Sequence, residues 1–487
     1  MDLTDVIIFL FALYFLNLWW RRYSSSRSSQ CRMNIPPGPK GWPLVGNLLQ
    51  VIFQGRHFVF IMRDLRKKYG PIFTMQMGQR TMIIVTDEKL IHEALVQRGP
   101  TFASRPPDSP IRLIFSVGKC AINSAEYGSL WRTLRRNFVT ELVTPTRVKQ
   151  CSWIRTWAME NHMKRIQTES VEKGFVEVMS QCRLTICSIL ICLCFGAKIS
   201  EEKIKNIENV LKDVMLITSP KKTQLECLVP LIKNRRAFVD AKESPNEEMV
   251  SPIGAAYVDS LFSLKPVERG GELRDEEIVT LCSEIVSAGT DTSATTLEWA
   301  LLHLVTDQNI QEKLYEEVVG VVGKHGVVEE DDVAKMPYLE AIVKETLRRH
   351  PPGHFLLSHA AVKDTELGGY DIPAGAYVEF YTAWVTENPE IWSDPGKFRP
   401  ERFLAGGDGV NADWTGTRGV TMLPFGAGRR ICPAWSLGIL HINLMLARMI
   451  HSFKWIPVPD SPPDPTETYA FTVVMKNSLK ARIQSRT

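Results

Sequence analysis

Residues 425–435 read FGAGRRICPAW, and this stretch decides how the other parts of the 487-residue chain are interpreted. Gly426 and Gly428 carry no Cβ, so the backbone there can approach another group closely. Pro433 suits the first turn of the helix that the apolar run AWSLGILHINLMLARMI predicts. Cys432 would then lie just before a helix N-terminus, where partial positive charge and free N–H groups stabilise a thiolate.

The chemistry of Cys432 has two interpretations at this point. A lone thiolate without a neighbouring cysteine is a poor zinc site, but it can serve as an axial ligand of haem iron. Arg430, two residues earlier, can pair with a carboxylate such as a haem propionate. The alternative is a glycine-rich turn that holds an inert core cysteine.

The composition is that of an intracellular globular protein. Hydrophobic residues make up 44% of the chain and the formal net charge is +4, too small for a dedicated nucleic-acid binder, so we predict no nucleic-acid partner. The cysteines are spread along the chain, several of them in apolar runs such as LTICSILICLCFG. Thiols in such runs are typical of buried residues in a reducing compartment.

The N-terminus carries the apolar run VIIFLFALYFLNLWW at residues 6–20, and the basic stretch RRYSSSRSSQCR follows at once. The run approaches the roughly 17–25 residues that cross a bilayer. A cleaved signal peptide is the alternative, but a small-residue cleavage site is missing and the tryptophan pair fits an interfacial belt. The positive flank places the bulk of the chain in the cytosol. We therefore predict a membrane anchor and basic linker at residues 1–33, and one large domain at residues 34–487.

The rest of the chain reads as predominantly α with small β-sheets. The segment IPPGPKGWPLVGN at residues 35–47 predicts a stiff hinge. Residues 71–87 predict a β-hairpin, and so do residues 369–381. Residues 126–350 have apolar positions at helical spacing, and FTVVM and LKARI near the end predict two short strands.

A helix predicted to begin near Arg274 contains residues of low helix propensity at its centre. TDTSATT at residues 290–296 follows Gly289, and hydroxyls there can bond to helix carbonyls and bend the helix. Asp291 and Thr292 supply a carboxylate and a hydroxyl side by side, which suits proton relay from water. A kinked structural helix is the alternative.

Two further patterns are ambiguous by themselves. Glu345 and Arg348 lie three apart in KETLRRHPP, a spacing that usually makes a surface pair, although Arg402 in PERF could complete a buried network. Trp131 and Arg135 lie four apart in LWRTLRR, so an indole N–H and a guanidinium could hold one anionic group. An amphipathic helix with its tryptophan in the core is the alternative for the second pattern.

Taken in order, these motifs resemble the cytochrome P-450 superfamily of haem-thiolate monooxygenases along the whole chain. The matching motifs are Trp131-x-x-x-Arg135, AGTDTS at residues 288–293, Glu345-x-x-Arg348, PERF at residues 400–403, and Phe425-x-x-Gly428-x-Arg430-x-Cys432. One position departs from the family pattern. Ala434 stands where the family usually has glycine, which adds a methyl group close to the expected haem edge.

The resemblance implies a cytochrome P-450 fold with an N-terminal anchor helix around haem b, iron protoporphyrin IX. Cys432 is implied as the iron ligand, in a loop with Phe425 and Gly428, and Thr292 with Asp291 as the proton-delivering pair. The implied propionate contacts are Trp131, Arg135, Arg430 and His359. The implied structural trio is Glu345, Arg348 and Arg402.

The resemblance also implies a function. A monooxygenase of this kind inserts one oxygen atom from O2 into a hydrophobic substrate, by hydroxylation or epoxidation, with electrons from NADPH through NADPH–cytochrome P-450 reductase. The chain looks most like plant enzymes of the endoplasmic reticulum membrane, near the seventy-seven family, which favours a fatty acid over a plant secondary metabolite. Two alternatives are a reductase-independent hydroperoxide isomerase, whose relatives tend to lose the acid–alcohol pair, and a non-catalytic haem or electron-transfer protein.

Overall fold

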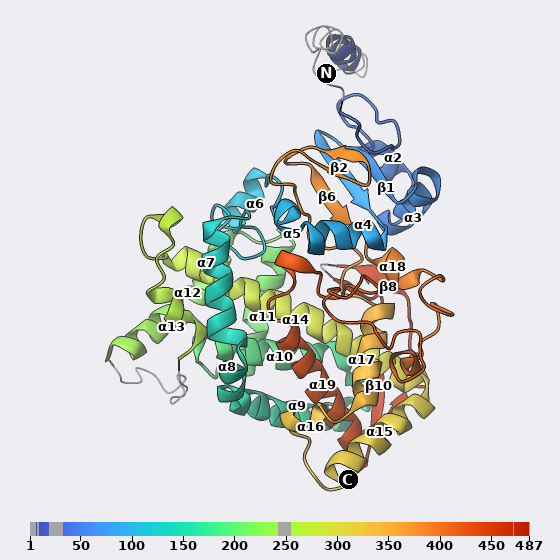
Figure 1. The fold of residues 1–487 in the computed structure, drawn as a ribbon. Helices are drawn as coiled ribbons and strands as arrows, with labels where there is room; N and C mark the ends of the chain where they lie inside the picture. The colour runs from blue at the N-terminus through green and yellow to red at the C-terminus, as the bar shows by residue number, and fades with distance from the viewer. Residues whose placement is uncertain (1–5, 7–8, 19–32, 242–254, 471, 487) are drawn as a thin grey trace. The chain divides into compact units, whose positions relative to one another are not determined.

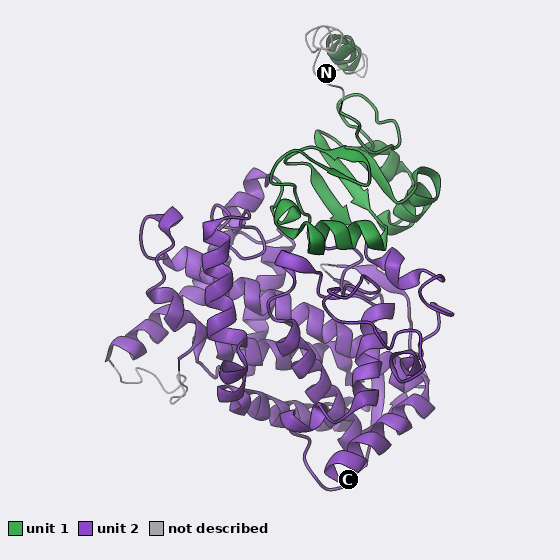
Figure 2. Ribbon diagram, viewed as in Figure 1, with its two compact units in different colours: residues 1–106, 357–381 green, residues 107–356, 382–487 purple. Residues whose placement is uncertain are grey.

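The computed structural model describes residues 6, 9–18, 33–241, 255–470 and 472–486 (Figure 1). It divides into two compact units (Figure 2). The smaller unit comprises residues 1–106 and 357–381, and the larger unit comprises residues 107–356 and 382–487. The predicted anchor and linker lie largely outside the described residues. Within them, Phe9–Leu18 is a short apolar helix.

The smaller unit is built on a three-stranded sheet in the order β1-β2-β6. β1 (Ile72–Met77) and β2 (Arg80–Val85) form an antiparallel hairpin in which Met77 lies opposite Arg80, so the hairpin predicted at residues 71–87 is confirmed. β6 (Tyr377–Phe380) joins the other edge of β2 in parallel. Beyond Phe9–Leu18, the helices described in this unit include α2 (Leu48–Phe53), α3 (Phe58–Tyr69), α4 (Glu88–His92) and α5 (Gly99–Phe102).

The hairpin predicted at residues 369–381 is wrong. β5 (Tyr370–Ile372) pairs with the preceding strand β4 (Thr365–Leu367), not with β6. Gly368 and Gly369 have φ of 60° and 78°, a left-handed turn that glycine adopts without steric cost, and it closes the hairpin earlier in the chain. The following strand is then available to pair with β2.

The segment predicted as a hinge, residues 35–47, is bonded to β1. The Thr74 N–H donates to the carbonyl of Pro37 at 2.8 Å, and the Gln76 N–H donates to Oδ1 of Asn47 at 2.7 Å. A Cβ on Gly38 would lie 1.8 Å from the Thr74 carbonyl oxygen, so the backbones touch. The proline-rich segment therefore borders the sheet of the smaller unit as an ordered part of it.

The larger unit is centred on α14 (Asp275–Thr306), which packs against α10 (Val178–Phe195). A Cβ on Gly289 would lie 2.7 Å from Cδ1 of Leu190, so the glycine permits this close contact between the two helices. Among the described residues, α10 is the one helix long and apolar enough to cross a membrane, but 78% of it is buried in the protein core. Its cysteines are unpaired core thiols, as predicted.

The other helices of the larger unit surround this pair (Figure 1). They include α6 (Pro110–Phe115), α7 (Ser129–Phe138), α8 (Pro145–Gln150), α9 (Ser152–Lys173), α11 (Glu201–Met215), α12 (Lys221–Ala241), α13 (Tyr257–Phe262), α15 (Gln308–Val322), α16 (Glu330–Val333), α17 (Pro337–Arg349), α18 (Ala383–Glu387) and α19 (Trp435–Ser452).

The strands of the larger unit are few and short. β3 (Val176–Glu177), β10 (Lys480–Ser485) and β7 (Phe453–Pro457) form one sheet in the order β3-β10-β7, and β8 (Glu467–Tyr469) pairs with β9 (Val473–Met475). β9 and β10 are the two short strands predicted from FTVVM and LKARI. The predominantly α class with small sheets is confirmed.

Candidate active site

The cysteine loop closes on itself directly before α19. The Cys432 N–H donates to the Phe425 carbonyl at 2.8 Å, and the intervening Gly426 and Gly428 have φ of 70° and 66°. Only glycine takes such angles freely, so both glycines are required by the turn. α19 begins at Trp435, which places Cys432 just before a helix N-terminus, as the sequence predicted.

Burial and the neighbouring groups shift the pKa of the Cys432 thiol in opposite directions. Burial raises the pKa of Cys432, and this is the largest effect. The Ala434 N–H and the guanidinium of Arg135 oppose it, because both favour the thiolate. The residue keeps part of its surface accessible. A metal cation bound at this thiol would favour its thiolate form, because metal ligation requires the deprotonated sulfur.

Of the side chains predicted as propionate contacts, Arg430 belongs to this loop, and Trp131 and Arg135 lie beside it. Arg135 Nη2 donates to the Ile431 carbonyl at 2.6 Å, next to the cysteine. The Arg430 guanidinium stacks over the Trp131 ring at 4.7 Å. Trp131 is buried, and its indole Nε1–H has no hydrogen-bond partner among the described residues. A buried donor without a partner is costly, so this indole fits an anionic ligand.

A short loop, residues 121–125, is held between the cysteine loop and α14. Arg430 donates to the carbonyls of Ile122 and Ala125 at 3.1 and 2.6 Å. Glu284 of α14 accepts the N–H groups of Ile122 and Asn123 at 2.9 and 2.6 Å. The two loops and the helix are therefore joined through one small set of backbone groups.

The departure at Ala434 carries no backbone strain. Its φ of −109° and ψ of 20° lie in a region that alanine adopts, so glycine's additional freedom is not needed at this position.

The middle of α14 is buried except around one partly accessible stripe. Glu284, Ala288 and Thr292 lie at four-residue spacing and are more accessible than the residues around them. The Thr292 hydroxyl donates to the Ala288 carbonyl at 2.8 Å, and the Thr296 hydroxyl donates to the Thr292 carbonyl at 2.8 Å. The hydroxyls thus bond back to the helix as predicted, yet α14 continues through the motif.

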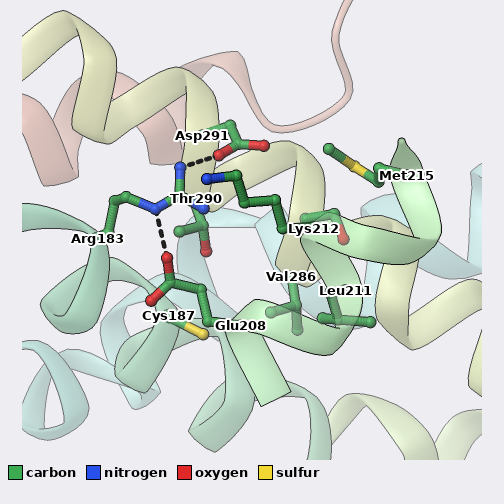
Figure 3. A pocket seen from close by; sticks show the side chains of 10 residues that line it. Arg183, Cys187, Glu208, Leu211, Lys212, Met215, Val286, Thr290 and Asp291 are labelled. Carbon is green, nitrogen blue, oxygen red and sulfur yellow. Dashed lines mark hydrogen bonds and ion pairs between the residues drawn. The ribbon is translucent and has the colours of Figure 1, made fainter. Parts of the chain in front are cut away.

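Asp291 points toward Arg183 and belongs to an ion-pair network (Figure 3). Arg183 of α10 donates from Nη1 to Asp291 and from Nε to Glu208 of α11, so one guanidinium joins three helices. Beside it lies a cavity of about 10 Å³, close to the room that one water needs. Asp291 is mostly buried and its charge is compensated, so the structure does not bring its carboxylate directly onto the Thr292 hydroxyl.

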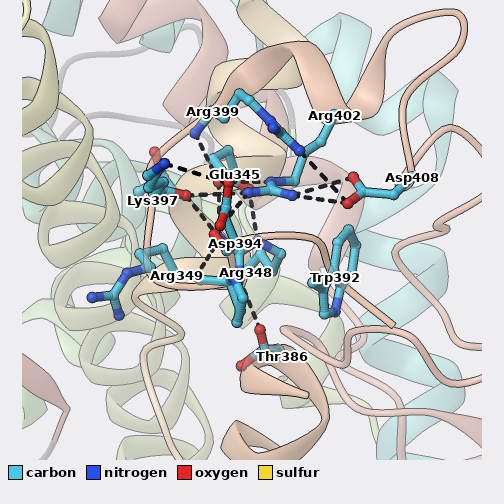
Figure 4. A network of polar contacts seen from close by, with 12 residues as sticks. Glu345, Arg348, Arg349, Thr386, Trp392, Asp394, Lys397, Arg399, Arg402 and Asp408 are labelled. Atoms are coloured by element: carbon cyan, nitrogen blue, oxygen red, sulfur yellow. Dashed lines mark hydrogen bonds and ion pairs between the residues drawn. The ribbon is translucent and has the colours of Figure 1, made fainter. Parts of the chain in front are cut away.

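Glu345, Arg348 and Arg402 form one buried network (Figure 4). Arg348 donates to both oxygens of Glu345 at 2.7 and 2.9 Å, and Arg402 Nε donates to Oε1 at 3.0 Å. Both arginines also donate to loop carbonyls, including those of Thr386 and Ser393 at 2.8 and 2.9 Å. The single carboxylate thus holds α17 and the PERF segment together.

His359 lies in the smaller unit, whereas the residues above lie in the larger one. Its backbone exchanges hydrogen bonds with Val378 at 3.0 and 2.8 Å, and its buried ring packs edge-to-face on Phe380. Its contact with haem stays a prediction.

The sequence reasoning missed three charged residues of this region. Arg183 binds both Asp291 and Glu208, and Glu284 holds the 121–125 loop. Arg183 carried a signal, because a charged residue inside the apolar run of α10 requires a buried partner. No such sequence signal marks Glu284 or Glu208, because acidic residues on helices are usually solvated.

Comparison with known proteins agrees with this geometry. A family model described as cytochrome P-450 matches residues 36–483. Cytochrome P-450 89A9 of Arabidopsis thaliana is 37% identical over 93% of this chain and 94% of that protein. Cheilanthifoline synthase of Argemone mexicana is 32% identical over 95% of this chain and 94% of that protein. A zebrafish cytochrome P-450 solved with abiraterone superposes with a TM-score of 0.73 at 22% identity, covering 88% of this chain and 100% of that one.

The fold and the cysteine loop define a haem-thiolate oxidoreductase. The chain belongs to the cytochrome P-450 family, whose members are monooxygenases that bind haem b, take electrons from a redox partner and act on hydrophobic substrates. Its matched relatives include plant enzymes, as expected, and the finer likeness to the seventy-seven family stays a prediction.

The residues present fit this cofactor. Cys432 offers a thiol just before the N-terminus of α19, and Trp131 offers a buried N–H that needs an acceptor. Arg135 and Arg430 place positive charge beside both. A dianionic, planar group with one metal at its centre matches this set of donors.

Proposed function

We propose that this chain is an NADPH-dependent monooxygenase that receives electrons from NADPH–cytochrome P-450 reductase. One observation carries the proposal. The Thr292 hydroxyl lies on the accessible stripe of α14, next in sequence to the charge-compensated Asp291, in a chain that also has the cysteine loop. A haem carrier or electron-transfer protein has no use for an acid–alcohol pair on its central helix.

Haem b, when bound, supplies the iron that activates dioxygen for insertion into the substrate. Cys432 would hold the iron, and Trp131, Arg135 and Arg430 would donate to the propionates. The Thr292 hydroxyl now donates to Ala288 within the helix. By rotating about its Cα–Cβ bond it can present its proton to the accessible side of α14.

Asp291 would return a proton to Thr292. Because Arg183 holds this carboxylate on another face of the helix, the transfer requires either a rotamer change at Asp291 or a bridging water. The small cavity beside Arg183 and Thr290 provides a place for such a water.

For the substrate, a fatty acid is our first candidate and a plant secondary metabolite the second. The first rests on the apolar character of the segment at residues 106–123, where Ile111, Leu113 and Ile114 are exposed on α6. The second is supported by relatives named for plant products, such as flavonoid 3'-monooxygenase of Arabidopsis thaliana, which is 30% identical. Either class would be hydroxylated or epoxidised.

For the location, we propose the endoplasmic reticulum membrane, with one N-terminal anchor and the catalytic part, residues 34–487, facing the cytosol. The short apolar helix Phe9–Leu18, with its exposed Phe9, Phe11 and Phe15, supports an anchor. The arginines at positions 21, 22, 27 and 32 support this orientation.

Two experiments test the reaction class. With reductase and NADPH, Thr292→Ala should lower product per NADPH by roughly tenfold and raise peroxide release, because a general acid is lost. Thr292→Ser keeps the hydroxyl and should retain coupling. Equal coupling in wild type and Thr292→Ala would contradict the assignment. Turnover of a fatty-acid hydroperoxide without NADPH would instead support the isomerase alternative.

A further inference from the structure

The loop at residues 121–125 follows a stretch of backbone in a rare conformation. Val117 and Lys119 have φ of 47° and 63°, and Gly118 between them has φ of 64°. A left-handed conformation is unfavourable for a β-branched residue such as valine, and it persists only where the surroundings hold it. Arg269 provides part of this restraint, since it donates to the carbonyls of Val117 and Gly118 at 2.9 and 3.0 Å.

Glu284 restrains the N–H side of the same loop. Its two carboxylate oxygens accept from consecutive backbone N–H groups, those of Ile122 and Asn123, at 2.9 and 2.6 Å. A carboxylate that accepts two amide hydrogen bonds is a strong, charge-assisted anchor. Because the residue is fixed on the long helix α14, the position of the loop depends on that helix.

The carbonyl side of the loop faces Arg430. Its two terminal nitrogens donate to Ile122 and Ala125, and in this position its guanidinium lies over the Trp131 ring. Ile122 is therefore bonded on its N–H side to α14 and on its carbonyl side to the cysteine loop. Moving this one peptide segment would move the arginine that stacks on the indole.

Glu284 also acts on the site through its charge. Burial lowers the pKa of Arg135, and the negative charge of Glu284 is one of the effects that oppose this change. Arg135 donates to the backbone of Ile431, next to the cysteine. The charge of Glu284 on α14 thus acts on a residue that is expected to lie beside the haem.

We propose that Glu284 is a positioning residue for the haem: it fixes the 121–125 loop, and through that loop it holds Arg430 and Trp131 in place to bind the propionates. The inference rests on haem binding by the cysteine loop, but not on the substrate or on the proton-relay assignment. Glu284 lies on the same stripe as Thr292, about 12 Å away along the helix at 1.5 Å per residue. Through the 121–125 loop it connects α14 with the proposed propionate contacts.

The test is the rate of haem transfer from the purified holoprotein to excess apomyoglobin, followed by absorbance. Glu284→Ala loses both acceptors and should release haem about tenfold faster, the effect of one hydrogen bond to a charged group. Glu284→Gln keeps one acceptor oxygen and should lie between wild type and Glu284→Ala. Glu276→Ala, an exposed acid on the same helix, is the matched control and should transfer haem at the wild-type rate.

A double-mutant cycle separates positioning from a general loss of stability. If Glu284 acts through Arg430, then adding Glu284→Ala to Arg430→Met should change the transfer rate by less than about twofold, because the two effects share one route. If the two substitutions instead accelerate haem transfer independently, so that their fold-changes multiply in the double variant, Glu284 does not act through Arg430. A wild-type transfer rate in Glu284→Ala would overturn the proposal altogether, while a normal haem-thiolate spectrum in the same sample would leave the proposed function intact.

Discussion

Arg183 and Asp291 are joined by an ion pair that links α10 to the centre of α14, and the same guanidinium binds Glu208 of α11. All three side chains are less than one-fifth exposed. Two carboxylates in one poorly solvated place require a cation between them, since like charges at short range strongly disfavour ionisation. The acid next to Thr292 is thus paired with a residue outside the recognised family motifs.

The first prediction concerns Arg183→Met. Without the cation, Asp291 and the partly buried Glu208 remain as neighbouring carboxylates, and we expect the free energy of unfolding to fall by about 3 kcal/mol. The measurement is the urea midpoint at neutral pH. Lys212→Met is the matched control, because Lys212 lines the same cavity but is exposed. We expect a change below about 0.5 kcal/mol for it, and equal midpoints for both variants would refute the prediction.

The second prediction concerns the carboxylate shared by Arg348 and Arg402. Glu345→Gln removes the one negative charge that contacts both buried guanidiniums, and we expect a loss of roughly 3–5 kcal/mol together with poor haem retention. The control is Glu340→Gln on the same helix, which breaks a half-exposed pair with Lys344. Such surface pairs contribute about 0–1 kcal/mol. Comparable losses in the two variants would contradict a structural role for the network.

The third prediction concerns acid stability. Burial lowers the pKa of His162 and of His441 from 6.5 to about 3. Below pH 6.5 the unfolded chain therefore binds one proton more per histidine than the folded chain, so stability is lost as pH falls from 6.5 toward 3. Each histidine contributes about 1.4 kcal/mol per pH unit in this window.

The variant His162→Gln isolates this effect from that of the carboxylates. Glutamine can still bond to Thr185, whose hydroxyl lies 2.8 Å from Nδ1 of His162. Between pH 6.5 and pH 5 the variant should lose about 2 kcal/mol less than wild type, measured by urea unfolding at each pH. The exposed His325→Gln serves as control and should follow the wild-type curve. Parallel curves for wild type and His162→Gln would show that His162 does not titrate differently on unfolding.

Local patterns predicted the elements whose partners are near in sequence. The hairpin of β1 and β2 has a two-residue turn, and the helices carry regular apolar spacing, so neighbouring residues decide them. The hairpin expected at residues 369–381 failed because its last strand pairs in parallel with β2, almost three hundred residues earlier. The Gly368–Gly369 turn is a local signal for the hairpin of β4 and β5, whereas nothing local indicates that β6 pairs with β2.

The motif residues around Cys432 could also be predicted, because a motif depends only on residue types and their spacing along the sequence. The residues that hold the motif residues in place could not be predicted. Glu284 reaches residues more than 160 positions away and Arg183 reaches Asp291 over 108 positions, distances at which a single sequence carries no pairing information. The backbone angles of Ala434 were equally hidden, so the absence of strain there is a finding of the structure.

The central claim is that Cys432 binds haem iron as a thiolate. The most direct measurement is the absorption spectrum of the purified, dithionite-reduced protein after carbon monoxide is added. We predict the red-shifted Soret band of a thiolate-ligated haem in wild type and its loss in Cys432→His, with Cys282→Ala, a buried core thiol, unchanged. A wild-type spectrum without that band, or one that Cys432→His leaves intact, would contradict the account.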